Sequence, residues 1–356
     1  REIVMWKDAN QDQSTTPFQW EAFYSVIFYA NQIINEGQQT MEASAEKDQI
    51  LAEAYALRAY AYFDLVNLYG KPYQASTAGS DRGVPINLSL DLEKTLPASS
   101  VAEVYAQVNA DIEKSSALMN LDQQADKVRY RFSKAALAAF KSRISLYQQN
   151  WEDALKNAET ALSINKTLVN LNTEKIVPNH YTSPEAILSL DNTFISALGY
   201  STAASKGLIA SYDQTNDLRF KTYFEKNGAD YKVIKGGNSE FRTSFRVSEL
   251  YFIKAEALLK SNRLEESKAT LNEVLKNRYT ATGFANVQTK VTSMNATQFM
   301  EFILEERNRE FALEGQRWFD LRRANQKQII HTISGVEYTL QKNDVRYTIE
   351  IPQQAS

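Results

Sequence analysis

The sequence predicts an all-α protein built from helical hairpins of the tetratricopeptide kind, and two observations predict it. Apolar residues recur at intervals of three and four over most of the chain, which is the period of an amphipathic helix. Residues 141–165 also have the spacing of a tetratricopeptide hairpin, in which small residues let two helices approach closely: Trp151, Ala154, Ala158 and Ala161. Residues 248–278 repeat this pattern, with matching offsets at Leu264, Ser267 and Val274.

The first 120 residues predict three helices and one irregular excursion. A proline opens and a glycine ends the apolar pattern of residues 17–37. A second helix follows over residues 44–69, so the two form an antiparallel hairpin. Residues 70–97 hold three glycines and three prolines, which favours an irregular path. A capping box that begins at Ser100 then opens a third helix.

Between the two tetratricopeptide-like copies, residues 166–245 have weaker periodicity. Glycines become frequent there, and short runs such as AILSLDNTF and YKVIKGG alternate like strands. We expect loops with small β-pieces in this stretch. Since loops on a rigid scaffold often carry binding residues, we also expect the function to reside there.

Charged residues occupy apolar stripes at two places. In residues 305–323, the apolar face of the helix passes through Glu306 and Glu310, and Arg58 lies on the apolar face of the second helix. A lone buried charge would cost several kcal/mol, so these charges should be paired. We expect Arg58 to pair with a carboxylate of residues 305–314, within one structural ion-pair network of Arg58, Glu306, Arg309, Glu310 and Arg317.

The composition excludes several classes of function. The chain has 356 residues and a net charge of −3, which gives no electrostatic footprint for nucleic acid. It has no cysteine and two histidines, so we expect neither a disulfide nor a thiolate or histidine-rich metal site. No phosphate-binding loop is present, and we expect no cofactor. No run approaches the ~20 apolar residues of a membrane-spanning helix.

Two segments resemble the SusD/RagB family, which are outer-membrane nutrient-binding lipoproteins of Bacteroidetes. In that family a helix with an Arg-Ala pair ends at Tyr-Gly, and the matching residues here are Arg58, Ala59, Phe63, Leu65, Tyr69 and Gly70. A late family helix matches at Glu306, Arg307, Glu310, Glu314, Gly315, Arg317, Asp320 and Arg323. The closing YTIEIPQQAS is similar to the family's Ile-Pro-x-x-Glu end, with Ala355 in place of the acid. The resemblance covers nearly the whole chain except residues 166–245.

The resemblance implies one SusD-like domain over residues 1–356. Its curved helical scaffold would span about residues 17–165 and 246–325, with a ligand-face insertion at about 166–245. It implies a glycan-binding protein of the cell surface, without catalytic activity, that delivers nutrient to a SusC-like TonB-dependent transporter. Family members are held to the outer membrane by a lipidated cysteine near the N-terminus. We expect this chain to lack that anchor and an early helix, and to be soluble as it stands.

Aromatic residues outside the helical periodicity are the candidate ligand contacts. Sugars present flat C–H faces that pack on aromatic rings, while their hydroxyls need polar partners. Rings at helical spacing are needed to fill the space between helices, whereas a ring in an irregular segment is available to a ligand. The candidates are Trp6, Tyr73, Tyr181, Phe194, Tyr200, Tyr212, Tyr231 and Phe241.

Two other functions are compatible with the residues alone. The first is a tetratricopeptide scaffold whose concave face binds a protein or peptide partner. Contiguous repeats would favour it, and the long aromatic-bearing insertion favours the solute binder. The second is a glycosidase that uses Glu306 and Glu310 as its paired carboxylates. Interleaved arginines favour a structural role for these acids, and a turnover assay on glycosides would separate the enzyme from both binding proteins.

Overall fold

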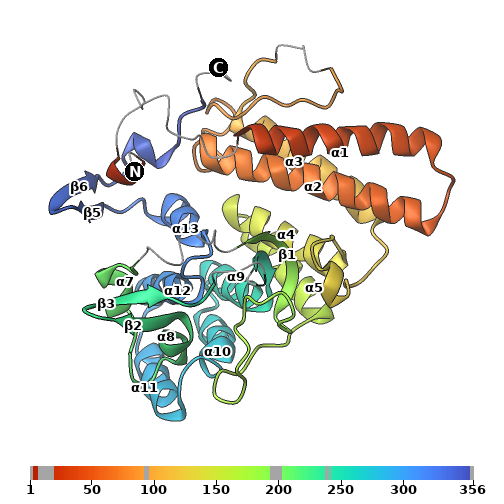
Figure 1. Cartoon of the computed structure of the whole chain (residues 1–356). Helices are drawn as coiled ribbons and strands as arrows, with labels where there is room; N and C mark the ends of the chain where they lie inside the picture. The colour runs from red at the N-terminus through yellow and green to blue at the C-terminus, as the bar shows by residue number, and fades with distance from the viewer. Residues whose placement is uncertain are drawn as a thin grey trace. The chain divides into compact units, whose positions relative to one another are not determined.

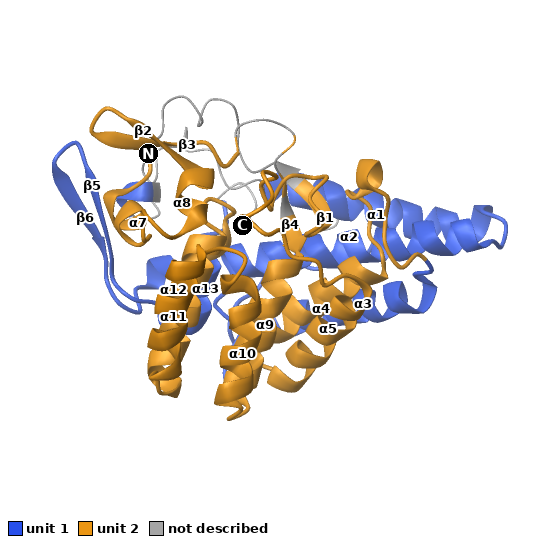
Figure 2. Ribbon diagram, turned by 90° about the horizontal axis from the view of Figure 1, so that it is seen from below, with its two compact units in different colours: residues 1–120, 318–356 blue, residues 121–317 orange. Residues whose placement is uncertain are grey.

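The computed structural model describes residues 3–6, 20–91, 96–192, 203–236, 240 and 242–352. It is mostly helical with little sheet (Figure 1), so the all-α prediction is confirmed. The chain forms two compact units (Figure 2), one of residues 1–120 with 318–356 and one of residues 121–317. None of the described helices is both long and apolar enough to cross a membrane.

The first unit is built on three helices: α1 (Trp20–Thr40), α2 (Ala45–Tyr69) and α3 (Val101–Leu118). Helix α2 packs against both others and is buried on nearly all sides. The predicted caps are present: the Ser44 side chain accepts from the backbone N–H of Lys47, and Ser100 and Glu103 form the capping box. The described residues between α2 and α3 form no helix or strand, as predicted.

The C-terminal part of the first unit packs on the chain's first described residues. Helix α13 (Gln316–Ala324) runs into this unit, and β5 (Ile329–Ile333) pairs antiparallel with β6 (Val336–Leu340). Ser334 and Gly335 have φ angles of 53° and 79°, as a tight two-residue hairpin turn requires. The 3₁₀ turns η1 (Ile3–Met5) and η3 (Val345–Tyr347) complete this part.

The second unit contains the tetratricopeptide-like hairpins. After the 3₁₀ turn η2 (Asp126–Val128) come α4 (Lys134–Tyr147) and α5 (Trp151–Ile164), then α9 (Val247–Lys260) and α10 (Leu264–Leu275). Ala154, Ala158 and Ala161 are fully buried, which lets α5 pack closely between α4 and α9. Helices α11 (Ala281–Thr292) and α12 (Ala296–Glu310) follow. A core formed mainly by α9, α10 and α12 joins these helices.

The insertion between the hairpins combines short helices and strands. Strand β1 (Ala186–Asn192) pairs antiparallel with β4 (Arg242–Arg246), and β2 (Phe224–Asn227) pairs with β3 (Asp230–Val233). These strands lie within or beside the runs that alternate in the sequence. The sequence did not predict the short helices α7 (Lys206–Ala210) and α8 (Leu218–Tyr223).

Candidate functional site

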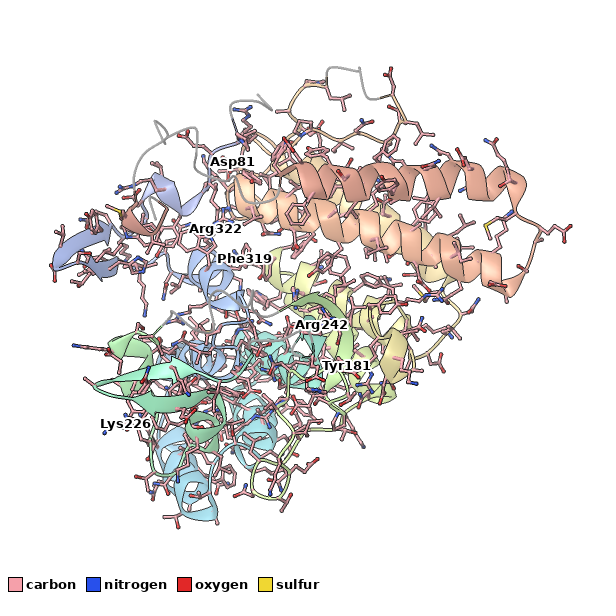
Figure 3. The ribbon with its side chains drawn as sticks, viewed as in Figure 1. Asp81, Tyr181, Lys226, Arg242, Phe319 and Arg322 are labelled. Carbon is pink, nitrogen blue, oxygen red and sulfur yellow. The ribbon has the colours of Figure 1, made fainter. Side chains whose placement is uncertain are left out.

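A small pocket lies beside the β1–β4 ribbon of the second unit. The ribbon is extended by two backbone hydrogen bonds, because Arg242 N donates to Asn179 O and Tyr181 N donates to Glu240 O, both at 2.9 Å. Tyr181 and Arg242 therefore lie close together beside β1 (Figure 3). The pocket is lined by Pro178, Asn179, Ala186, Leu188, Ser189, Arg242, Ser244, Phe245, Arg246, Glu314 and Gln316.

The pocket is small, with a volume of about 10 Å³, and its surface is more polar than apolar. Proline, alanine, leucine and phenylalanine side chains supply the apolar part, and Ser189, Arg242 and Gln316 supply a hydroxyl, a guanidinium and an amide. The Gln316 amide is oriented because its oxygen accepts from Arg307 Nη2 at 2.8 Å.

Tyr181 lies half-buried in the segment beside the pocket. The ring of His180 stacks against it at 5.0 Å between centroids and 29° between planes. Glu240, which is exposed, places a carboxylate oxygen 3.8 Å from the His180 Nε2. Arg129 Nη1 donates to the Tyr181 carbonyl at 3.1 Å, which fixes the backbone of this segment. An aromatic ring with charged neighbours therefore lies near this small pocket.

Behind the pocket, charged side chains form a buried network that is electrically balanced. Its five cations and five carboxylates come from segments far apart in the sequence: Arg219, Lys235, Arg246, Arg278 and Arg309 with Glu185, Asp217, Glu306, Glu310 and Glu314. Helix α12 and the turn after it carry three of these acids. The network joins the insertion to the helices of the second unit.

Glu310 lies at the centre of this network. Its carboxylate contacts Arg246 at 2.6 Å, Arg278 at 2.9 Å and Arg219 at 3.4 Å, and the side chain is completely buried. Burial alone would raise the pKa of Glu310, but the arginine charges outweigh it and hold the pKa well below its usual value.

Glu306 has a similar environment one turn earlier. Arg219 Nη2 lies 2.7 Å and Arg309 Nη2 lies 2.6 Å from its oxygens, and the Tyr279 hydroxyl donates to it at 2.9 Å. Burial raises its pKa, but the charges of Arg309 and Arg219 lower it to about 2. A general acid needs access to substrate and a raised pKa. The geometry of Glu306 and Glu310 is therefore that of a structural network.

Two predicted network members lie elsewhere. Arg317 contacts Glu305 at 2.8 Å, and both side chains are partly exposed. Arg58 is buried as predicted, but its predicted pairing with residues 305–314 is wrong: the guanidinium binds both oxygens of Asp111 on α3, at 2.5 and 2.8 Å. Asp111 shares the buried face of α3 with Val104 and Val108, so the apolar stripe of that helix could have identified it.

Two predicted ligand rings belong to the packing of the insertion. Tyr212 is 5% exposed, packs against Phe220 and Phe224, and donates its hydroxyl to the Arg309 carbonyl at 2.7 Å. Its assignment as a ligand contact is corrected, because the ring is inaccessible and its hydroxyl is used. Tyr231 is half-buried against the edge of Phe220 at 5.2 Å.

Two further rings, Trp6 and Tyr73, lie in the first unit. Trp6 is half-buried and stacks against Trp318 at 5.9 Å and His331 at 4.8 Å, so much of its surface is covered. Tyr73 contacts Tyr105 edge-on at 5.0 Å. Within the first unit these two rings pack against different neighbours. The remaining candidates, Phe194, Tyr200 and Phe241, lie outside the described residues.

Sequence reasoning missed the polar residues of the pocket. Asn179, Ser189, Arg242 and Gln316 have no motif spacing in common, and antiparallel pairing and the turn after α12 bring them together. The alternating run at β1 was the available signal, because its pairing with β4 places Ser189 opposite Ser244. Across the ranges that the structure describes, no group of histidines and acids could hold a metal ion.

Comparisons with known proteins match two parts of the chain. Residues 2–146 match a family model described as starch-binding and associating with the outer membrane, and residues 198–356 match the model of the SusD family. The SusD-like protein P38 of Formosa agariphila is 25% identical over 91% of this chain and 76% of its own length.

Solved structures show the same fold. A putative sugar binding protein from Bacteroides vulgatus superposes with a TM-score of 0.79 at 21% identity, over 97% of this chain and 84% of that one. A laminarin binding SusD-like protein superposes with a TM-score of 0.63 at 19% identity, over 86% of this chain and 77% of that one. At these identities the likeness concerns the fold.

Proposed function

This chain belongs to the SusD/RagB family, and from that premise we propose that it binds a glycan at the cell surface. The glycan would then pass to a SusC-like TonB-dependent transporter of the outer membrane. The observation that carries the proposal is the small, mainly polar pocket near the partly exposed ring of Tyr181, which residues of the insertion form together with Glu314 and Gln316.

The chemistry of a sugar fits this arrangement. A pyranose has an apolar C–H face that packs on an aromatic ring, and Tyr181 offers a partly exposed ring for it. Its hydroxyls both donate and accept hydrogen bonds, so the Ser189 hydroxyl, the Gln316 amide and the Arg242 guanidinium can pair with them. A neutral sugar chain would bind here without a metal or a cofactor.

We propose binding without catalysis. A glycosidase needs two carboxylates that reach the scissile bond, and the paired acids of α12 are enclosed by arginines. The SusC-like transporter and an N-terminal lipid anchor are proposed from family membership. SusD family proteins are associated with the outer membrane, which agrees with both proposals.

The experiment is a binding screen on the purified chain with starch and laminarin among the polysaccharides, followed by two variants. Tyr181→Ala and Arg242→Ala should each weaken binding by about 1–3 kcal/mol, because a hot-spot side chain affects affinity more than folding. Tyr29→Ala is the matched control, since this tyrosine is 63% exposed on α1, far from the pocket in sequence.

The controls decide between outcomes. Both variants should keep the wild-type melting temperature, and Tyr29→Ala should keep the wild-type affinity. Unchanged affinity in both pocket variants would place the site elsewhere. Release of a soluble sugar product by the wild-type chain, abolished by Glu310→Gln in a folded protein, would contradict the absence of catalysis.

A further inference from the structure

The turn between α12 and α13 supplies two of the residues that line the pocket. Glu314 and Gln316, at the end of this turn, both line the pocket. Leu313 has a φ of 67°, an uncommon conformation for a bulky residue, and Gly315 has a φ of 79°. A strained backbone of this kind persists only where the surroundings hold it. What holds residues 311–315 therefore determines where the Glu314 and Gln316 side chains point.

Lys235 holds this turn from the insertion. Its ammonium group has three N–H donors, and all three find acceptors: Glu310 O at 2.9 Å, Ala312 O at 3.1 Å and Glu314 Oε1 at 2.6 Å. The side chain is completely buried. The Glu310 carbonyl belongs to the last turn of α12, where the helix dipole favours a cation. One buried amine thus binds the helix end, the turn and a pocket carboxylate.

We propose that Lys235 is a positioning residue for the pocket: its ammonium holds residues 311–315 and so places Glu314 and Gln316 at the ligand. The inference rests on the proposed function, because the ligand is the glycan of that proposal. The inference goes beyond the proposed function, because Lys235 does not itself line the pocket. The ligand affinity would then depend on a buried charge that does not touch the ligand.

Burial makes the Lys235 ammonium easier to deprotonate, and the charged groups that face it act in both directions. Glu314 and Glu310 attract the charge, Arg246 repels it, and the Tyr223 ring lies 4.0 Å from the ammonium. Burial is the largest influence, and the pKa of Lys235 falls to about 8. Loss of the proton removes an N–H donor and the ion pair to Glu314. Affinity at the pocket should then decline as the pH rises from 7 to 9.

The first test needs no ligand. Hydrogen exchange of residues 311–317 is measured on the whole chain at pH 7, for the wild type, Lys235→Met and a control, Lys268→Met. Lys268 is also a buried lysine that bonds a carboxylate and a carbonyl, but on α10. Exchange in this segment should accelerate at least tenfold in Lys235→Met only. Wild-type exchange there, in a folded Lys235→Met, overturns the inference.

A second test follows binding of laminarin or starch, whichever the wild type binds. Wild-type affinity should fall several-fold between pH 7 and 9, while Lys235→Met should bind at least tenfold more weakly at pH 7 and show no further fall. A purely structural lysine would not produce this difference in pH profile. A wild-type profile that is flat from pH 7 to 9 contradicts the inference.

The two tests separate the two proposals. Absence of binding to any polysaccharide counts against the proposed function alone, and the exchange experiment still decides whether Lys235 holds the turn. Should Lys235→Met fail to fold, the wild type supplies the answer. The exchange rate of its residues 311–317, corrected for the intrinsic pH dependence, should rise between pH 7 and 9 relative to the rate of α10. If the ratio of these two rates stays constant, the inference is overturned.

Discussion

The Arg58–Asp111 pair of the first unit and the ion-pair network of the second unit hold buried arginines in different ways. In the first unit, Arg58 meets one acid, Asp111, and a second partner, the Asn31 amide oxygen, at 2.7 Å. In the second unit, every arginine of the network but Arg309 meets at least two acids, and Glu310 alone meets three arginines. The pair joins two helices, whereas the network joins six segments spread from residue 185 to residue 314.

The difference teaches what buried charge does in each place. A single bidentate pair costs about as much to desolvate as it returns in attraction, so it contributes mainly to the register of two helices. A balanced network lets each charge share several partners, and it can hold segments that have few apolar residues of their own. The insertion is a segment that the network helps to hold, because its strands are short and occur only in pairs among the described residues.

The largest effect is expected at the centre of the network. Glu310→Gln removes the charge that Arg219, Arg246 and Arg278 share, and leaves three buried cations with fewer partners. The free energy of unfolding of the second unit should fall by on the order of 5 kcal/mol, at the upper end of the range for breaking a buried pair. Urea denaturation measures it, and a loss below 1 kcal/mol would show that the network is not cooperative.

A smaller effect is expected at the pair. Arg58→Met should cost about 4 kcal/mol, since it leaves the Asp111 carboxylate buried without its cation. The double variant Arg58→Met with Asp111→Leu removes both charges and should recover most of that loss. If the double variant is as unstable as the single one, packing of the arginine stem rather than charge explains the cost.

Acid should weaken the second unit through the network. The folded pKa of Glu306 is about 2, below its usual value of 4.5, so its contribution is complete above pH 4.5 and is lost as the pH falls toward 2. The loss is on the order of 3 kcal/mol by the size of this shift. Thermal unfolding from pH 6 to 2 measures it. Glu306→Gln should show a shallower slope over that range, and an equal slope would assign the acid sensitivity to other carboxylates.

The scaffold could be predicted from the sequence because its signals are local. Helical periodicity, the Ser100 capping box and the small residues of α5 each act within a few turns of one helix. The burial of Glu306 and Glu310 was predictable for the same reason, since spacing defines the face of a helix. Their partners were not, because Arg219, Arg246 and Arg278 come from other segments and the spacing along one helix cannot identify them.

The candidate site was predictable only as a region. The alternating runs identified β1 and β3 but not β4, and the pairing of β1 with β4, which places Ser189 opposite Ser244, follows from tertiary structure. Treating residues 166–245 as loops also overestimated how many of its rings are accessible. Helices α7 and α8 bury Tyr212 within a small core that a loop would not form.

The smallest predicted effect compares two tyrosines of the insertion, one buried and one partly exposed. Tyr212 and Tyr231 both contact Phe220, but Tyr212 is buried and donates to the Arg309 carbonyl, whereas Tyr231 is half-buried with its hydroxyl 3.4 Å from Gln214. Tyr231→Ala should lower the free energy of unfolding by roughly 1 kcal/mol. The ring is only partly buried, so removing it exposes little apolar surface and leaves no enclosed cavity. Tyr212→Ala should cost about 3–4 kcal/mol, since it leaves a cavity and an unsatisfied carbonyl. Denaturation of both variants measures the difference, and equal costs would mean that the β2–β3 hairpin is as much a part of the core as α7 and α8.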